Sequence, residues 1–231
     1  VKDSHTTTQY LSHGFTWRPM IITQNQKRCM KNTKYFVEIG SCDFDSLNDL
    51  AKEGWKGVVV EPISEYLNNL EKHKGVHYIN AAVDVLPGTR EMNVFNKEVV
   101  DNDRDFAGMS SFAEYTHTSN QSNVTSRTVE TITYQHAIQS SGIPRVDFLK
   151  IDTEGHDLVI LNQVIYDGKH RPGIIKAEHK HIQNGAYVIK ELLESRGYLV
   201  FVERYDVYAI DVLTKPDPLR NHFDYNFNAL T

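Results

Sequence analysis

Short runs of β-branched and aromatic residues alternate with segments of helical periodicity from Tyr35 onward. The runs are almost continuously apolar, which is typical of strands that are buried on both faces of a parallel sheet. The pattern predicts strands at 35–39, 57–60, 76–83, 146–151, 173–177, 198–203 and 207–213. Because only a few residues separate the last two, we expect them to form an antiparallel hairpin.

Between these strands, apolar residues recur at helical spacing. The spacing predicts helices near 47–51, 64–70, 158–165 and 188–193, with Ser64 as an N-cap and Gly197 as the stop of the last helix. Strands that alternate with helices favour an α/β fold, with helices on both faces of a mostly parallel, Rossmann-like sheet. The antiparallel strand is expected at the C-terminal end of that sheet.

The stretch 96–126 is polar and weakly periodic, and it predicts a long excursion from the sheet. Such an excursion is either a loop that covers a binding site or a solvated insertion. A length of 231 residues suits one domain. We expect an N-terminal extension (1–34), a core (35–213) and a C-terminal tail (214–231). The start at Val1 leaves open that the chain is part of a longer, multidomain polypeptide.

Composition narrows the expected partners. The formal net charge is −5 and no dense Lys/Arg block occurs, which argues against nucleic acid as a partner. No apolar run approaches the roughly 20 residues of a membrane-spanning helix. The chain has two cysteines and no secretory signal at its start, so we expect a cytoplasmic location.

The ends of the first two strands carry the features of a nucleoside site. Gly40 follows the first strand, where it permits a tight turn and close backbone approach to a ligand. Glu61 ends the second strand, where a carboxylate can accept both hydroxyls of a ribose. The turn lacks the G-x-G-x-x-G that brings the backbone against a pyrophosphate. S-adenosylmethionine has no pyrophosphate and is therefore favoured, while an NAD-dependent oxidoreductase and a non-catalytic nucleoside-binding domain remain the alternatives.

Five segments of the chain resemble the FkbM-type family of S-adenosylmethionine-dependent methyltransferases. They are V-E-I-G-S at 37–41, V-V-E-P-I-S-E-Y-L at 59–67, N-A-A-V at 80–83, M-S-S at 109–111 and V-D-F-L-K-I-D-T-E-G-H-D at 146–157. The resemblance implies a class I methyltransferase fold and O-methylation of a sugar or glycan-like acceptor. Residues 42–45 depart from the family, which commonly has a second glycine or small residues there.

The resemblance also implies a set of residues that contact the methyl donor. These are Glu38, Gly40, Ser41, Asp43, Glu61, Pro62, Ala81 and Ala82. Among them, Ser41 and Asp43 are expected near the methionine part, and Ala81 and Ala82 near the adenine.

Candidate catalytic residues follow from the chemistry of methyl transfer, which needs an aligned hydroxyl and a group that takes its proton. Open α/β sheets bind ligands at the carboxyl ends of their strands. Asp152 and Glu178 both lie at predicted strand ends, each two residues after a lysine, and His156 follows nearby. We predict that Asp152, His156 and Glu178 are catalytic.

The same acids suggest a metal site as one of two mechanisms. Asp152, Glu178 and His179 could hold Mg²⁺ or Mn²⁺, which would orient two substrate hydroxyls and lower the pKa of one of them. Without a metal, Asp152 or His156 becomes the general base. In both cases the expected partner is a small-molecule or saccharide acceptor.

Overall fold

The computed structural model describes residues 33–44, 46–103, 106–112 and 123–213. Its elements, in chain order, are β1 (Tyr35–Ile39), η1 (Leu47–Glu53), β2 (Lys56–Val60), α2 (Ser64–Asn69), β3 (Val76–Ile79), β4 (Ala82–Val83), β5 (Gly88–Phe95), α3 (Lys97–Asn102), β6 (Val124–Ile132), α4 (Tyr134–Ser141), β7 (Phe148–Ile151), α5 (Asp157–Tyr166), β8 (Ile174–Glu178), α6 (Gly185–Glu194), β9 (Tyr198–Val202) and β10 (Asp206–Asp211). Most of the predicted N-terminal extension and the predicted C-terminal tail lie outside the described residues.

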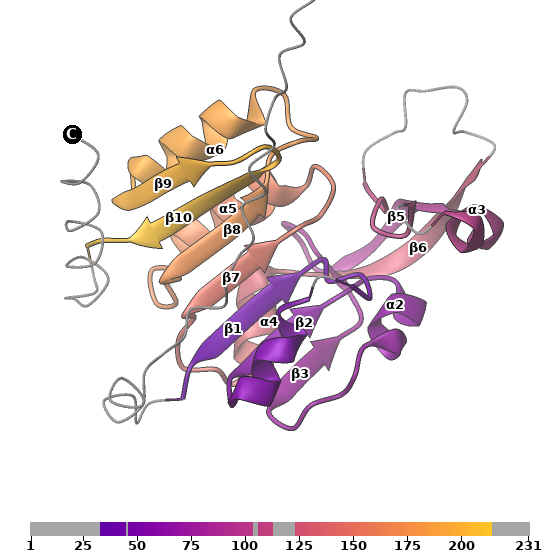
Figure 1. The fold of residues 1–231 in the computed structure, drawn as a ribbon, viewed down its shortest axis with the longest axis horizontal. Helices are drawn as coiled ribbons and strands as arrows, with labels where there is room; N and C mark the ends of the chain where they lie inside the picture. Colours follow the sequence, from indigo (N-terminus) through magenta and orange to yellow (C-terminus); the bar gives the residue numbers. More distant parts are fainter. Residues whose placement is uncertain (1–32, 45, 104–105, 113–122, 214–231) are drawn as a thin grey trace, which may run out of the picture. The chain divides into compact units, whose positions relative to one another are not determined.

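The main sheet has seven strands in the order β3-β2-β1-β7-β8-β10-β9 (Figure 1). Within this sheet, β3, β2, β1, β7 and β8 run parallel to one another. In contrast, β10 is antiparallel to both of its neighbours. The chain runs from β1 outward to β3 and later returns to β7 beside β1. Such a reversal of strand order leaves a crevice at the carboxyl ends of the strands, where ligands bind in open α/β sheets. The predicted sheet with an antiparallel C-terminal strand is confirmed.

Helices cover both faces of this sheet, as predicted. Successive side chains of a strand point to opposite faces. Val37 and Val58 therefore lie in the larger core cluster with buried side chains of α4, α5 and α6. Phe36 and Val59 lie on the other face, in a smaller cluster with leucines of η1 and α2.

A second sheet of three strands, in the order β4-β6-β5, was not predicted. The predicted strand 76–83 is in fact divided between β3 in the main sheet and β4 in the second sheet. At the break, the side-chain amide of Asn80 donates to the carbonyls of Glu61 and Pro62. β5 and β6 form a long antiparallel ladder that is exposed along much of its length. Their sequences are therefore polar and lack the apolar pattern by which strands are predicted. The predicted excursion at 96–126 includes α3 and the start of β6.

Two predicted helix boundaries also differ from the structure. The segment at 47–53 is a 3-10 helix whose N-cap is Ser46, which accepts a hydrogen bond from the backbone N–H of Asn48. Ser64 is the first residue of α2 and not its cap, because the N-cap is Ile63. The last predicted stop is close, since α6 ends at Glu194 and Gly197 has a φ of +77°.

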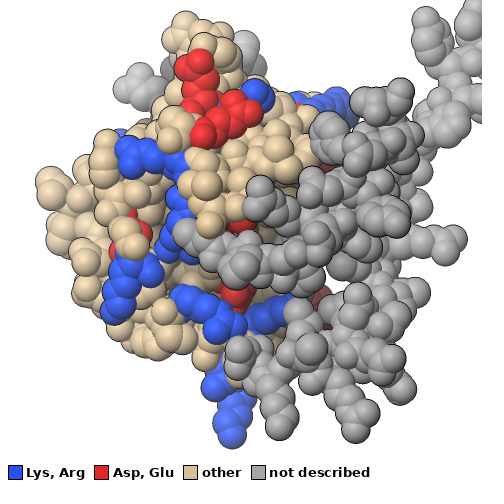
Figure 2. Space-filling model, turned by 90° about the vertical axis from the view of Figure 1, so that its left-hand side faces the viewer, with Lys and Arg blue, Asp and Glu red and all other residues tan. Residues whose placement is uncertain are grey.

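The surface carries both signs of charge. Figure 2 shows Lys and Arg side chains in several groups over the described part of one face, with uncharged residues between them and acidic side chains near the top of the view. The net charge of −5 is therefore not spread evenly and does not decide by itself whether an acceptor is anionic. Within the described residues, no helix has both the length and the apolar character needed to cross a membrane.

The turn after β1 yields a stability prediction. Gly40 has a φ of +77°, and a Cβ there would lie 1.9 Å from the backbone oxygen of Asp152. Gly142 has a φ of +66°, but a Cβ there would meet nothing within 4 Å. Both alanine substitutions carry the left-handed penalty of roughly 1–2 kcal/mol. Gly40→Ala should lose a further ~2 kcal/mol or more in urea unfolding because of the clash. Equal losses in the two variants would contradict the close approach.

Candidate functional site

A cavity of about 370 Å³ lies at the carboxyl ends of the central strands. Its lining comes mainly from the turn after β1, the end of β2, β4 with the residue before it, the segment before β6, and the end of β7 with the turn after it. Single residues are added by α2 (Tyr66), by β5 (Met92) and by the segment after β8 (Lys180). Eight predicted site residues line it, namely Gly40, Ser41, Glu61, Pro62, Ala81, Ala82, Asp152 and His156. The volume lies in the range of small-molecule sites.

Four predicted residues are not part of this lining. Glu38 is fully buried and accepts hydrogen bonds from the Ser46 hydroxyl and from the backbone N–H of Leu47 at 3.0 Å. Asp43 accepts a hydrogen bond of 2.8 Å from the side chain of Asn69. Both acids therefore support the segment between β1 and α2 from outside the cavity. The other two, Glu178 and His179, lie at the end of β8.

Glu61 joins the loops that follow β1 and β2. Its Oε2 accepts the backbone N–H of Cys42 and its Oε1 that of Ile63, both at 2.8 Å. Burial raises the pKa of Glu61 to about 7, although both N–H groups favour the ionised form. Each carboxylate oxygen has two lone pairs, so each keeps one direction for a further donor. A pair of ribose hydroxyls has the chemistry to use those directions.

A buried lysine is part of the cavity lining. Lys150 lies directly beside Glu38 in the ladder between β7 and β1. Its Nζ is 3.6 Å from Glu38 Oε1 and 3.7 Å from Asp152 Oδ2. Burial raises the pKa of Glu38, and the charge of Lys150 opposes that shift. Lys150 thus pairs with Asp152, the acid two residues after it. Lys176 differs, because it pairs with Asp206 at 3.2 Å.

Glu178 lies in an acidic cluster with Glu154 and His181. Each of the three offers one possible cation ligand, and these ligand atoms lie within 4.8 Å of one another. His181 Nε2 is 2.8 Å from Glu154 Oε2. The predicted ligand His179 does not join them, because its Nε2 donates to the carbonyl of Glu203 at 3.1 Å.

Protonation of its glutamates explains how the acids of this cluster can lie so close together. Burial, with repulsion from Glu154 and Asp152, raises the pKa of Glu178 to about 8. Burial likewise raises the pKa of Glu154 to about 7. A protonated Glu178 removes most of the repulsion, so the cluster does not require a cation.

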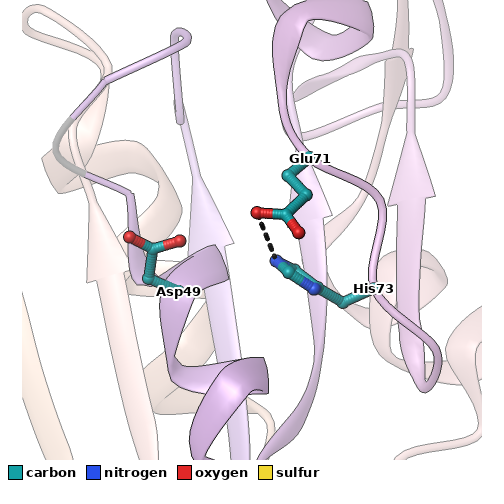
Figure 3. Close-up of side chains that lie close together, drawn as sticks. All are labelled: Asp49, Glu71 and His73. Carbon is teal, nitrogen blue, oxygen red and sulfur yellow. Dashed lines mark ion pairs between the residues drawn. The ribbon is translucent and has the colours of Figure 1, made fainter.

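A second group of possible ligands lies away from the cavity. Asp49, Glu71 and His73 have side chains close together, with Glu71 and His73 facing each other (Figure 3). Lys52 Nζ lies 2.8 Å from Asp49 and 3.0 Å from Glu71. Lys52 forms ion pairs with both acids, so the group is an ion-paired surface cluster.

His156, at the N-terminus of α5, is held by residues that the sequence reasoning missed. Its Nε2 is 3.0 Å from Oδ1 of Asp84, and Oδ2 of Asp84 accepts from Arg90 at 2.7 Å. Burial lowers the pKa of His156, and Asp84 only partly opposes this. His156 is therefore neutral at pH 7. Asp84 directly follows β4, so the strand-end rule that singled out Asp152 could have found it.

Ser110 belongs to the M-S-S segment at 109–111 on which the family resemblance is based. It lines the cavity, and its Oγ is buried without a hydrogen-bond partner among the described residues. A buried hydroxyl without a partner is costly. The adjacent Ser111 differs, since its hydroxyl donates to the carbonyl of Glu154 at 2.8 Å. Ser110 therefore offers a polar contact for a bound molecule.

The strand order, the antiparallel β10 and a cavity with an acid at the end of β2 together define the class I methyltransferase fold. The family model of the methyltransferase FkbM domain matches residues 35–200. The chain therefore belongs to this family of S-adenosylmethionine-dependent methyltransferases.

Comparison with solved structures finds further similar proteins. The N-terminal domain of human METTL16 in complex with SAH is 14% identical, with a TM-score of 0.39, over 78% of this chain and 60% of that one. Human methyltransferase 10 domain containing protein is 13% identical, with a TM-score of 0.37, over 79% of this chain and 72% of that one. The chain thus spans less than two thirds of the METTL16 domain. A comparison with curated protein sequences gives no match.

The acidic cluster predicts how stability changes with pH. The pKa of Glu178 is raised from 4.5 to about 8, so its contribution to stability is present below pH 4.5 and is lost as the pH rises to 8. Glu178→Gln should therefore raise the free energy of unfolding at pH 8 by roughly 1 kcal/mol, with little effect at pH 4.5. Urea unfolding at both pH values measures this.

A matched variant reverses the sign of that effect. The hydrogen bond from Arg127 lowers the pKa of the exposed Glu65. Glu65→Gln should therefore cost a little stability at pH 8 and none at low pH. A pH profile that is the same in both variants would contradict the assignment of Glu178.

Proposed function

We propose that the chain is an O-methyltransferase that transfers the methyl group of S-adenosylmethionine to a hydroxyl of a sugar or glycan-like acceptor. The observation that carries this proposal is the cavity at the ends of β1 and β2, where the Gly40 turn and the buried Glu61 carboxylate lie together. Membership of the FkbM family supports methyl transfer. The resemblance of the five sequence segments to this family implies a sugar hydroxyl as the acceptor.

The residues of this cavity suit the proposed donor. Glu61 binds the two ribose hydroxyls through the acceptor directions that the backbone N–H groups leave open. Ala81 and Ala82 are buried, small and apolar, and they lie beside the adenine. Gly40 brings the backbone of the turn close, and the unpartnered hydroxyl of Ser110 gains a partner. Ser41 lies in the same lining, near the methionine part.

When bound, the donor supplies a methyl group on a positively charged sulfur. The side chains align the acceptor and receive its proton. Among the three predicted catalytic residues, His156 is neutral at pH 7 and lines the cavity. Asp152 also lines it, beside Lys150 at 3.7 Å, and orients the acceptor. The protonated Glu178 lies outside the lining, and its Oε2 is buried without a hydrogen-bond partner among the described residues, so a catalytic role for it stays a prediction. A catalytic Mg²⁺ or Mn²⁺ stays a prediction.

A second cavity favours an extended acceptor. It has a volume of about 590 Å³ and shares Lys180 with the first cavity. Tyr187 and Tyr205 also line it, and these residues are 62% and 40% exposed. An exposed aromatic ring offers an apolar face with a polar tip, which suits a sugar. A saccharide could therefore reach from the methyl donor past Lys180 to these tyrosines.

Glu61→Gln tests the donor site. The glutamine amide cannot accept hydrogen bonds at its nitrogen end, so the variant loses one backbone contact and one ribose contact. We expect S-adenosylmethionine to bind at least about tenfold more weakly in calorimetry. Glu65→Gln, which lies outside the cavity lining, serves as the control and should bind normally. Unchanged affinity in Glu61→Gln would contradict the placement of the ribose.

Ser110→Ala separates ligand binding from folding. Removal of an unpartnered buried hydroxyl should leave stability unchanged or raise it by up to about 1 kcal/mol. The same change should weaken donor binding by about fivefold, because the bound molecule loses a hydrogen bond. Ser111→Ala should instead lower stability, since the hydroxyl of Ser111 holds the turn after β7. Normal donor binding in Ser110→Ala would show that Ser110 is not a ligand contact.

A further inference from the structure

We propose that Asp84 is a positioning residue for His156, which it holds in the Nε2–H tautomer so that Nδ1 is the proton acceptor for the substrate hydroxyl. This inference rests on the proposed methyltransferase function. It selects one base among the three predicted catalytic residues, and it assigns a role to two residues, Asp84 and Arg90, that the sequence did not single out.

Four side chains form a closed ring of contacts, which we call the Asp84 network: Asp84, His156, Phe112 and Arg90. Asp84 contacts His156 at 3.0 Å and Arg90 at 2.7 Å. The guanidinium of Arg90 lies 4.1 Å from the centre of the Phe112 ring. Phe112 in turn meets the His156 ring edge-on, with centroids 5.2 Å apart and an angle of 79°. Each side chain is held by two others, so the imidazole is fixed in orientation.

The charges in this network set the direction of the hydrogen bond. Burial raises the pKa of Asp84, but hydrogen bonds from Arg90, the backbone N–H of Val85 and His156 outweigh it and hold the pKa below its usual value. Asp84 is therefore ionised at neutral pH and can only accept. The neutral His156 must then donate from Nε2, which leaves the lone pair on Nδ1.

The other ring nitrogen is available for chemistry. His156 is the N-cap residue of α5, but its side chain makes no capping hydrogen bond. Among the described residues, Nδ1 has no hydrogen-bond partner, and His156 lines the cavity. In the transfer step, the acceptor O–H bond breaks and its proton moves to Nδ1. The oxygen forms a bond to the methyl carbon, and the carbon–sulfur bond breaks with its electron pair left on sulfur. Asp84 stabilises the resulting imidazolium.

The tautomer of His156 tests this proposal. Nitrogen-15 NMR of histidine-labelled protein at pH 8 distinguishes the two neutral tautomers, and His156→Gln identifies the signal. A charge-assisted hydrogen bond should favour the Nε2–H form by about tenfold or more in the wild type. In Asp84→Asn this preference should fall to a mixture of both forms. The wild-type spectrum alone overturns the proposal if it shows the Nδ1–H form.

The chain provides a matched control in a second Asp–His pair. Asp167 lies 2.9 Å from Nδ1 of the buried His170, so His170 should show the Nδ1–H form. Asp167→Asn should change the signals of His170 and leave those of His156 unaltered. If Asp84→Asn leaves the His156 tautomer unchanged, Asp84 does not position the ring.

Donor binding, measured by calorimetry on the same wild-type sample, separates the two proposals. If only the positioning role of Asp84 is wrong, His156 would show the Nδ1–H tautomer while S-adenosylmethionine binds normally. Failure of the proposed function would appear as absent donor binding while the expected tautomer is present.

Discussion

The close approach of Gly40 to the backbone carbonyl of Asp152 is the constraint on which the cavity depends. A Cβ at position 40 would lie 1.9 Å from that oxygen, so the turn after β1 can pass the end of β7 only as glycine. The turn is further tied to β2, because the Gly40 N–H donates to the carbonyl of Val60 at 2.9 Å. These contacts bring the ends of three strands together, and the cavity forms where they meet.

Buried charge is the second feature of the site, and hydrogen bonds compensate for it. Glu61 accepts two backbone N–H groups, and Lys150 lies between Glu38 and Asp152. A buried carboxylate without partners would be strongly destabilising. The backbone N–H groups that bind Glu61 leave one acceptor direction open on each of its oxygens. The groups that stabilise the loops therefore also line the cavity.

The neighbourhoods of Glu178 and His156 separate two kinds of proton chemistry. Among the acids at the ends of β7 and β8, burial and mutual repulsion keep Glu178 protonated near neutral pH. Around His156, Arg90 keeps Asp84 ionised, and burial keeps the imidazole neutral. A neutral imidazole beside an ionised acid is suited to accept a proton, whereas a protonated carboxyl is suited to donate a hydrogen bond.

The sequence by itself determined the main sheet and the residues at its strand ends, among them Gly40, Glu61 and Asp152, because buried parallel strands and their turns leave a local apolar pattern. It missed β5, β6 and the partner of His156, since an exposed antiparallel ladder has a weak pattern and Asp84 lies 72 residues from His156. The predicted ligand His179 is not one of the clustered groups, because β8 ends at Glu178 and the alternation of its side chains ends with it. Only the tertiary structure decided that His181 joins Glu154 and Glu178, because contacts between distant segments depend on how the strands pair and not on local periodicity.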